Sequence, residues 1–402
     1  MVLDRYGCKI LLLTVSQTVQ YISTCLQWRF CSFKKKHIHN KFRSIIFISG
    51  GTVDITVQEV LHDNNLRELH KASGGAWGGT KVDEQFLQMI VKVVGDKVMQ
   101  KFKCESKSDE LDLLQEFEMK KHVIRPNLNR KICFRIPIAL LNAFKEEYHE
   151  ELTKSIKETY LANSMNLVKG GKLMVNMDML GKLFSTVSDS IINHLQDILS
   201  NPLCRDVDTI LMVGGFSECL MIQEALKSSF PQKNVIVPED AGLAIVKGAV
   251  LFGHNPATIV SRKAKYTYGI KTTRDFIEGD PRDKKLNVDG CAKCKDVFDK
   301  HVEINQTVKV GEALNSQIYY PLHQNIKEVL VPVYTSTDYN PSYTTETTCD
   351  YLGKLVVPLQ GPSVKDNAIV VQMTLGGTEL EVEAVEKTTK KRLTATFDFL
   401  DH

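Results

Sequence analysis

The spacing of apolar residues changes near residue 256, and this change constrains the fold more than any other feature of the sequence. Before it, both periods occur: Val53, Ile55 and Val57 alternate with polar residues as in a strand, whereas Val82 and Phe86 begin a run at helical spacing. After it, the apolar runs are short and strand-like, as in "KEVLVPVY" and "AIVVQMTL". The sequence therefore predicts an α/β unit over residues 44–255 and an all-β sandwich over residues 262–402.

The composition is that of an ordinary globular chain. Its 402 residues are 43% hydrophobic and 25% charged, with a net charge of +3, which allows two or three domains and argues against a dedicated nucleic-acid binder. Ten cysteines without a dense framework indicate a reducing compartment, so we expect a cytoplasmic protein. Cys291 and Cys294 form a C-x-x-C pair, but no second pair of ligands follows, and no metal site is predicted.

Residues 1–43 fit neither predicted domain. Residues 10–33 are fairly apolar, but serine, threonine and glutamine interrupt them, so a membrane-spanning helix is not expected. Asp4 offsets the charge of Arg5 and no small-residue cleavage site follows, which disfavours a signal peptide. The segment is left unassigned, as a disordered or mispredicted start, with membrane association as the alternative.

Two local patterns predict where helices begin and end. Apolar residues at three-and-four spacing predict one helix over about residues 82–102. Residues 208–230 predict a buried strand, a Gly-Gly turn and a helix, with the Ser217 hydroxyl capping the first turn of that helix.

Three glycine corners carry the chemistry of the chain: Gly50-Gly51-Thr52, Gly78-Gly79 and Gly214-Gly215. Backbone binding of a polyphosphate needs glycines, because only a residue without Cβ lets successive amides approach an anion closely. A helix that follows the turn adds unpaired amides and partial positive charge. Each corner alone is typical of a tight turn, but the three together in one α/β domain predict a phosphate site.

These corners resemble a known family. "GGTVDITV", "GGAWGG", "ILMVGGFSE" and "PEDAGLAIVKGAVLFG" are similar to the phosphate loop, the next glycine corner, the adenosine corner and the closing helix of the DnaK-type heat shock 70 kDa proteins. The amino-acid sequence of these motifs most resembles the divergent subfamily 12, with members 12A and 12B. "VVQMTLGGTELEVEAVEKTTKKRLTATFDF" is similar to the last strands of the family's β-sandwich. The resemblance covers about residues 49–399.

The resemblance implies a fold and a function. The fold is lobe two of an actin-like (ribonuclease H-like) ATPase with a helical insertion, followed by the substrate-binding sandwich. The function is that of a stress-response chaperone that binds ATP or ADP with magnesium. The sandwich would bind unfolded or extended peptide segments, with co-chaperones as further partners and no nucleic acid.

The resemblance also assigns residues. Gly50, Gly51 and Thr52 match phosphate-loop positions, Asp54 matches the aspartate after them, and Gly79 matches a contact near the terminal phosphate. Gly214 and Gly215 match the adenosine corner, and Glu239 lies near a purine-side acidic position. Glu118 and Lys121 match the helix beside the purine and ribose, although a solvated helix face explains them equally well.

The departures from the family pattern concern catalysis. Phe47 stands where the family has the aspartate that organises magnesium and the attacking water, and Ser49 stands at the first glycine of the loop. Only 46 residues precede this motif, and they contain no first phosphate loop, catalytic lysine or glutamate. We therefore expect an N-terminally truncated family member with no catalytic residue and negligible ATP hydrolysis, so that its status as an enzyme is uncertain.

The C-terminal part departs from the pattern as well. The helical lid of typical members does not follow the predicted sandwich, and "NPATIVSRKAK" lacks their acidic-leucine linker. Two hypotheses remain: a chaperone-like ATP-binding protein with an incomplete nucleotide site, or a scaffold of the same family that binds no nucleotide. A sugar kinase or actin relative is disfavoured because the sequence past residue 256 predicts a sandwich.

Overall fold

The computed structural model describes residues 42–48, 50–61, 65–126, 130–158, 160–254, 256–323, 326–361, 363–376 and 379–398. The chain divides into two compact units. The central unit takes its described residues from Tyr21–Val57 and Ala72–Val250, and the C-terminal unit takes its own from Gln58–Lys71 and Leu251–His402.

One β-sheet organises the central unit. Its strands in this unit are β1 (Phe42–Ile48), β2 (Val53–Val60), β3 (Leu66–Gly75), β7 (Thr209–Val213) and β8 (Asn234–Ile236), hydrogen-bonded in the order β3-β2-β1-β7-β8. β1 runs parallel to β7, with Phe47 opposite Val213, and β7 runs parallel to β8. All five residues of β7 are buried, which explains its unbroken apolar run.

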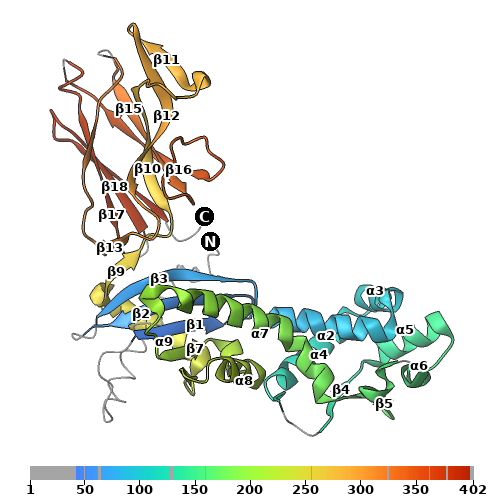
Figure 1. Cartoon of the computed structure of the whole chain (residues 1–402). Helices are drawn as coiled ribbons and strands as arrows, with labels where there is room; N and C mark the ends of the chain where they lie inside the picture. The colour runs from blue at the N-terminus through green and yellow to red at the C-terminus, as the bar shows by residue number, and fades with distance from the viewer. Residues whose placement is uncertain are drawn as a thin grey trace, which may run out of the picture. The chain divides into compact units, whose positions relative to one another are not determined.

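Helices and a small second sheet complete the central unit (Figure 1). The helices are α2 (Gly79–Val94), α3 (Asp96–Glu105), α4 (Lys107–Lys121), α5 (Ile138–Tyr148), α6 (Leu152–Glu158), α7 (Met177–Ser200), α8 (Leu220–Ser229) and α9 (Ala244–His254). The small sheet is antiparallel in the order β4-β6-β5, formed by β4 (Ile132–Arg135), β6 (Lys172–Val175) and β5 (Met165–Val168).

The single helix predicted over residues 82–102 is two helices. Gly95 has φ +87°, its N–H donates to the Val91 carbonyl, and it separates α2 from α3. The left-handed backbone favours glycine here, and a Cβ at this position would also lie 2.4 Å from the Tyr148 hydroxyl. The apolar spacing continues on both sides of Gly95 because both helices bury their apolar faces, and this continuity concealed the break.

The C-terminal unit contains two antiparallel sheets that share one hydrophobic core. One sheet has the order β11-β12-β10-β15-β16 and the other has the order β14-β17-β18-β19. β17 alternates buried and half-buried residues along its whole length, as a strand with one face on a core does. The strands are β10 (Thr267–Asp275), β11 (Lys285–Val288), β12 (Cys291–Val302), β14 (Gln317–Tyr319), β15 (Glu328–Ser336), β16 (Cys349–Pro358), β17 (Ile369–Leu375), β18 (Glu379–Glu386) and β19 (Arg392–Asp398).

The tip of the β2–β3 hairpin, Gln58–Lys71, belongs to the C-terminal unit, although the sequence placed it in the α/β domain. Strand β9 (Ile259–Lys263) pairs parallel with β3, Leu66 lying opposite Ile259, and β13 (Thr307–Lys309) pairs with β9. The Lys71 ammonium also donates to the Lys265 carbonyl at 3.0 Å. Ladder and side-chain bonds therefore tie the hairpin tip to the segment around β9.

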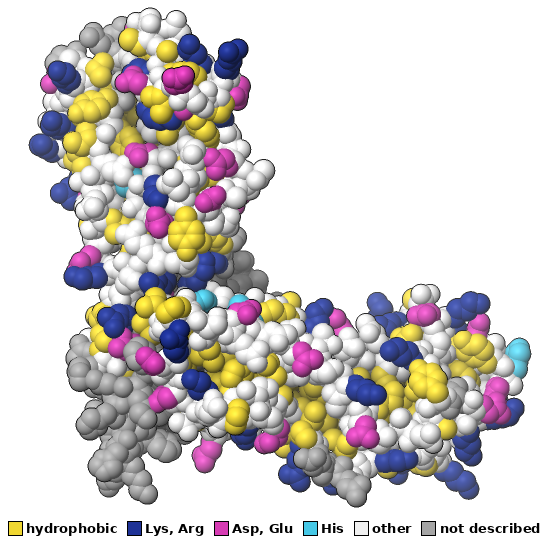
Figure 2. All heavy atoms as spheres, in the orientation of Figure 1, with side chains coloured by type: hydrophobic (Ala, Val, Ile, Leu, Met, Phe, Trp, Pro, Cys, Tyr) yellow, Lys and Arg dark blue, Asp and Glu magenta, His cyan; other side chains and the backbone are white. Residues whose placement is uncertain are grey.

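The surface carries charges of both signs. Lys and Arg side chains are interspersed with Asp and Glu over the face drawn in Figure 2, in agreement with the small net charge. Among the helices that the structure describes, none combines the length and the apolar character needed to cross a bilayer.

Candidate functional site

The first two glycine corners are in direct contact. The Gly78 N–H donates to the Gly51 carbonyl at 3.2 Å, and the Thr80 N–H donates to the Gly50 carbonyl at 2.6 Å. A Cβ added to Gly78 would lie 2.5 Å from the Gly51 carbonyl carbon, which no side chain tolerates. Gly78 is therefore a glycine because the loop after β1 lies directly against it.

The third corner lies beside the first because of the sheet register. β1 and β7 are parallel neighbours with Phe47 opposite Val213, so the loops that leave their carboxyl ends start next to each other. Gly214 has φ +96°, a conformation that favours glycine, and its N–H donates to the Ala241 carbonyl at 2.9 Å. In open α/β sheets, ligands bind outside the carboxyl ends of the parallel strands.

Gly79 and Lys121 connect the second corner to the third. A Cβ added to Gly79 would lie 3.2 Å from the Lys121 ammonium and 3.3 Å from the ring of Phe216, the residue that follows Gly215. The same ammonium lies 5.4 Å from the centre of the Phe216 ring. The three corners thus form one continuous region, which we call the glycine corners.

The charge of Lys121 is neutralised by two neighbouring carboxylates. Its side chain is 3% exposed, and its ammonium lies 2.8 Å from Asp83 Oδ1 and forms a second ion pair with Glu118. Burial raises the pKa of Asp83, against the opposing hydrogen bond and charge of Lys121. Burial would also raise the pKa of Glu118, but the hydrogen bond and charge of Lys121 prevail and lower it. The solvated-face interpretation is therefore wrong for Lys121, while Glu118 is exposed.

For three of the glycines, the residues that the structure describes show no structural need for glycine. Gly50, Gly51 and Gly215 do not have a positive φ. Beyond their chain neighbours, no described atom lies within 4 Å of a Cβ built on any of them. They contrast with Gly78 and Gly214, where a close backbone approach or a left-handed conformation requires glycine.

The remaining predicted residues lie around these corners. Thr52 follows Gly51 directly, and Asp54 is half-buried on β2. Glu239 is exposed in the turn that ends at Ala241, the partner of Gly214. Ser49 lies outside the described residues.

The sequence did not identify two members of this region, Asp83 and Phe216, and it misassigned Ser217. Asp83 lies one helical turn after Gly79, so it faces the same side of α2, but its pairing with Lys121 crosses 38 residues of chain. The Ser217 hydroxyl donates to the Gly214 carbonyl at 2.6 Å within a 3₁₀ turn, and α8 begins only at Leu220. Ser217 therefore stabilises the glycine turn and does not cap a helix.

The C-x-x-C pair lies on β12 in the C-terminal unit. Cys291 is exposed and Cys294 is buried, and both are free thiols. Residues three apart on a strand point to opposite faces, so the two sulfurs do not face a common site. The described part of the chain holds no cluster of three or more His, Cys, Asp or Glu side chains that could bind a metal ion.

Comparison with known proteins identifies relatives of the chain. The chain is 32% identical to heat shock 70 kDa protein 12A of Mus musculus over 370 residues, which are 89% of this chain and 54% of that protein. It is 32% identical to the 12A protein of Homo sapiens over 368 residues, with the same two shares, 89% and 54%. It is 30% identical to heat shock 70 kDa protein 12B of Homo sapiens over 369 residues, 88% of this chain and 53% of that protein.

The chain belongs to the heat shock 70 kDa protein family, in its 12A/12B subfamily. No model of a protein family matches the sequence. The chain spans about half the length of the curated relatives that it matches.

A magnesium nucleotide, which membership of this heat shock family implies, fits part of the region. The empty Cβ positions of Gly50, Gly51 and Gly215 leave room for a ligand to reach their backbone. The charges fit less well, because Lys121 already serves Asp83 and Glu118. The backbone thus suits a polyphosphate, but the ammonium of Lys121 is already paired with two carboxylates.

Proposed function

We propose that the protein is a chaperone-like member of this family that binds ATP or ADP weakly at the glycine corners. One observation carries the proposal: within the described part of the chain, neither a left-handed backbone nor a neighbouring atom requires glycine at Gly50, Gly51 and Gly215, which lie at the carboxyl ends of neighbouring parallel strands. Close approach of a ligand to the backbone supplies the missing reason.

The charges at the corners make this binding dependent on magnesium. Asp54, Asp83, Glu118 and Glu239 lie at or next to the corners, and Lys121 offsets only part of their charge. A bare triphosphate would meet a negative environment, so magnesium supplies the positive charge that the side chains do not. Phe47 offers no carboxylate to position a water molecule, and we therefore propose negligible hydrolysis.

The domain assignment belongs to the same proposal. We assign residues 44–255 to lobe two and the closing helix of the actin-like ATPase, and residues 262–402 to the sandwich that binds substrate in the family. The residues proposed to contact the nucleotide or to frame its site are Gly50, Gly51, Thr52, Asp54, Gly79, Glu118, Lys121, Gly214, Gly215 and Glu239.

Thermal unfolding with three alanine variants tests the nucleotide site. A ligand that binds the folded state alone stabilises it by about 2.7 kcal/mol at a hundredfold excess over Kd, so magnesium-ATP is expected to raise the Tm of the unaltered chain. Gly51→Ala and Gly215→Ala are expected to fold normally, since their Cβ atoms meet nothing, but to lose this rise. Gly181→Ala on α7 makes only an ordinary contact with Met221, at 3.6 Å, and is the control that keeps it.

The scaffold alternative predicts a different result. If millimolar magnesium-ATP leaves the Tm of the unaltered chain unchanged, the corners do not bind nucleotide and the protein acts through contacts alone. The ion pairs of Lys121 with Asp83 and Glu118 support this alternative, because they leave its charge less available to a phosphate.

We further propose that the C-terminal unit binds an extended peptide along β16. β16 is the last strand of its sheet, and its Val356 lies directly opposite Leu330 of β15. Both side chains are exposed, Val356 by 42% and Leu330 by 49%. An added strand would take backbone hydrogen bonds from the edge and apolar contacts from this pair.

Fluorescence polarisation of a labelled extended apolar peptide tests this second proposal. Val356→Lys places a charge on the edge strand and is expected to weaken binding about tenfold, which corresponds to about 1.4 kcal/mol. Ile277→Lys changes an exposed apolar side chain outside the strands and is expected to leave binding unchanged. Equal loss in both variants would refute the β16 edge as the binding site.

A further inference from the structure

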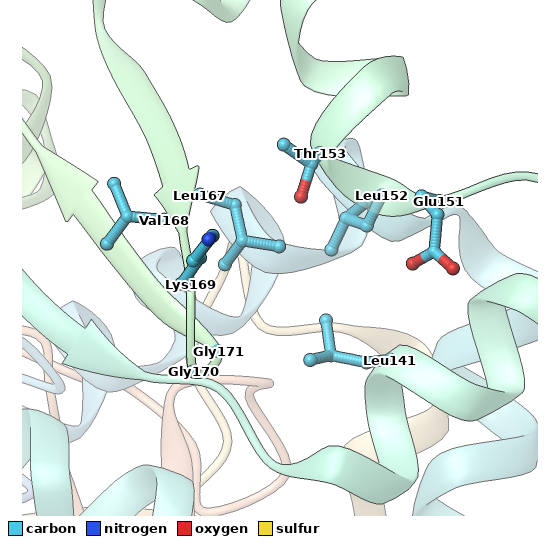
Figure 3. Close-up of a pocket in the computed structure, with 9 residues that line it drawn as sticks. All are labelled: Leu141, Glu151, Leu152, Thr153, Leu167, Val168, Lys169, Gly170 and Gly171. Atoms are coloured by element: carbon cyan, nitrogen blue, oxygen red, sulfur yellow. The ribbon is translucent and has the colours of Figure 1, made fainter.

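A cavity of about 400 Å³ lies beside the β5–β6 hairpin, remote in sequence from the glycine corners (Figure 3). We call it the hairpin cavity. Its walls come from α5, the start of α6, the end of β5 and the turn between β5 and β6. Its volume falls within the range of small-molecule sites, about 300–1,000 Å³.

One side of the hairpin cavity is an apolar cup. Leu141 of α5, Leu152 of α6 and Leu167 of β5 point toward one another (Figure 3). Leu152 and Leu167 are buried, and Leu141 is half-buried at the mouth. Three leucines from three elements make a pocket of the size and chemistry that a branched aliphatic group fills.

The other side presents an uncompensated cation and a hydroxyl. Lys169 has no carboxylate within ion-pair distance among the described residues, and the Thr153 hydroxyl makes no hydrogen bond within the same residues. Glu151 also lines the cavity, but its carboxylate is held 2.6 Å from Lys145. The positive charge of Lys169 therefore remains available to a ligand.

The turn that carries Lys169 is set by two glycines. Gly170 and Gly171 have φ +81° and +68°, and the Ile136 N–H donates to the Gly171 carbonyl at 2.7 Å. This bond ties the turn to a residue two positions before α5, so the hairpin end is anchored to the wall that holds Leu141. A Cβ on Gly170 would meet nothing within 4 Å, so the space beside Lys169 is open.

We propose that the hairpin cavity binds an aliphatic carboxylate. The branched chain occupies the leucine cup, and the carboxylate accepts charge-assisted hydrogen bonds from Lys169, with the Thr153 hydroxyl as a further donor. Two sources offer this chemistry: the C-terminal leucine-like residue of a peptide, and a free short-chain acid. The proposal involves none of the residues of the nucleotide proposal and stands or fails separately.

Isothermal titration of the full chain with four probes tests the inference. The probes are 4-methylpentanoate, its neutral analogue 4-methylpentanamide, an acetylated peptide ending in free leucine, and the same peptide with an amidated end. The carboxylates are expected to bind at least about tenfold more tightly than their amides, because an ionised acceptor forms the stronger hydrogen bond with Lys169. Tighter binding of the peptide acid than of 4-methylpentanoate identifies a peptide C-terminus as the source, and the reverse identifies a free acid.

Two lysine variants on the same hairpin separate charge at the cavity from charge in general. Lys169→Met keeps the aliphatic stem and is expected to remove the preference for carboxylate over amide. Lys172→Met removes an exposed charge of β6 that does not line the cavity, and is expected to leave the preference intact. The proposal is overturned if none of the probes binds at about 10 mM. This concentration is about tenfold above a Kd of about 1 mM, which would already be weak binding. It is equally overturned if the acid and the amide bind with the same affinity, or if both lysine variants lose the same amount of affinity for the carboxylate probes.

Discussion

The glycine corners and the hairpin cavity contain the same parts, a pair of glycines and a lysine, arranged in opposite ways. At the corners, Gly50 and Gly51 adopt ordinary conformations and Lys121 is committed to two carboxylates. At the cavity, Gly170 and Gly171 adopt left-handed conformations, and Lys169 has no carboxylate partner among the described residues.

This contrast teaches that residue types alone do not define an anion site. A glycine that the backbone conformation requires reveals nothing about a ligand, whereas a glycine without such a reason does. A lysine that is already paired adds little attraction for an anion, whereas an unpaired one adds its full charge. The corners should therefore bind an anion with a metal ion, and the cavity should bind one without it.

The largest expected effect is on Lys121. Lys121→Met leaves Asp83 and Glu118 facing each other without a cation, and we expect a loss of about 2 kcal/mol in the free energy of unfolding. This is below the range for fully buried pairs, because 25% and 54% of the two carboxylate side chains are exposed. Lys169→Met should change stability by less than about 0.5 kcal/mol. Urea unfolding measures both, and equal small losses would show that Lys121 is not the structural cation described above.

The next largest effect is a difference in stability between alanine variants of the two glycine pairs. Gly170→Ala forces a Cβ into a left-handed conformation and is expected to cost about 1 kcal/mol of stability. Gly50→Ala should instead stabilise the fold by about 0.4–1 kcal/mol, because it lowers the entropy of the unfolded chain at no conformational cost. Thermal unfolding without ligand compares the two. Destabilisation by Gly50→Ala would mean that this loop has a structural need for glycine after all.

The smallest effect is on the pH dependence of stability. The pKa of Glu118 is lowered in the folded chain, so its ionised form stabilises the fold above the pKa of the unfolded chain, and this contribution is lost as pH falls through the folded pKa. Glu118→Gln should therefore cost stability at pH 7, by less than about 1 kcal/mol for so exposed a carboxylate. The difference should vanish in acid below the usual glutamate range, as urea unfolding at several pH values can establish. A difference that persists there would exclude the charge of Glu118 as its cause.

Much of the architecture could be predicted from sequence because it rests on local periodicity. The alternation at Val53, Ile55 and Val57 predicted β2, and the apolar run after residue 208 predicted the buried strand β7, and both are confirmed. The break at Gly95 was missed because the apolar period continues through it. Ser217 was wrongly predicted to cap a helix because it lies within a 3₁₀ turn, Gly215–Glu218, and α8 begins only at Leu220.

The sites were harder to predict because they depend on contacts distant in sequence. Periodicity and propensity cannot pair Lys121 with Asp83, and this pairing decides the charge of the corners. The diglycine Gly170-Gly171 was visible between two short strands, but no sequence pattern connects it with leucines from three elements.

Amide spectra of the chain labelled with [¹⁵N]glycine test the central claim most directly, because every glycine reports on its own position. On addition of magnesium-ADP, we predict that the resonances of Gly51, Gly79 and Gly215 shift while those of Gly170 and Gly171 do not, and that the shifts disappear when EDTA removes the metal. Resonances of the three corner glycines that stay in place at millimolar magnesium-ADP would contradict the account.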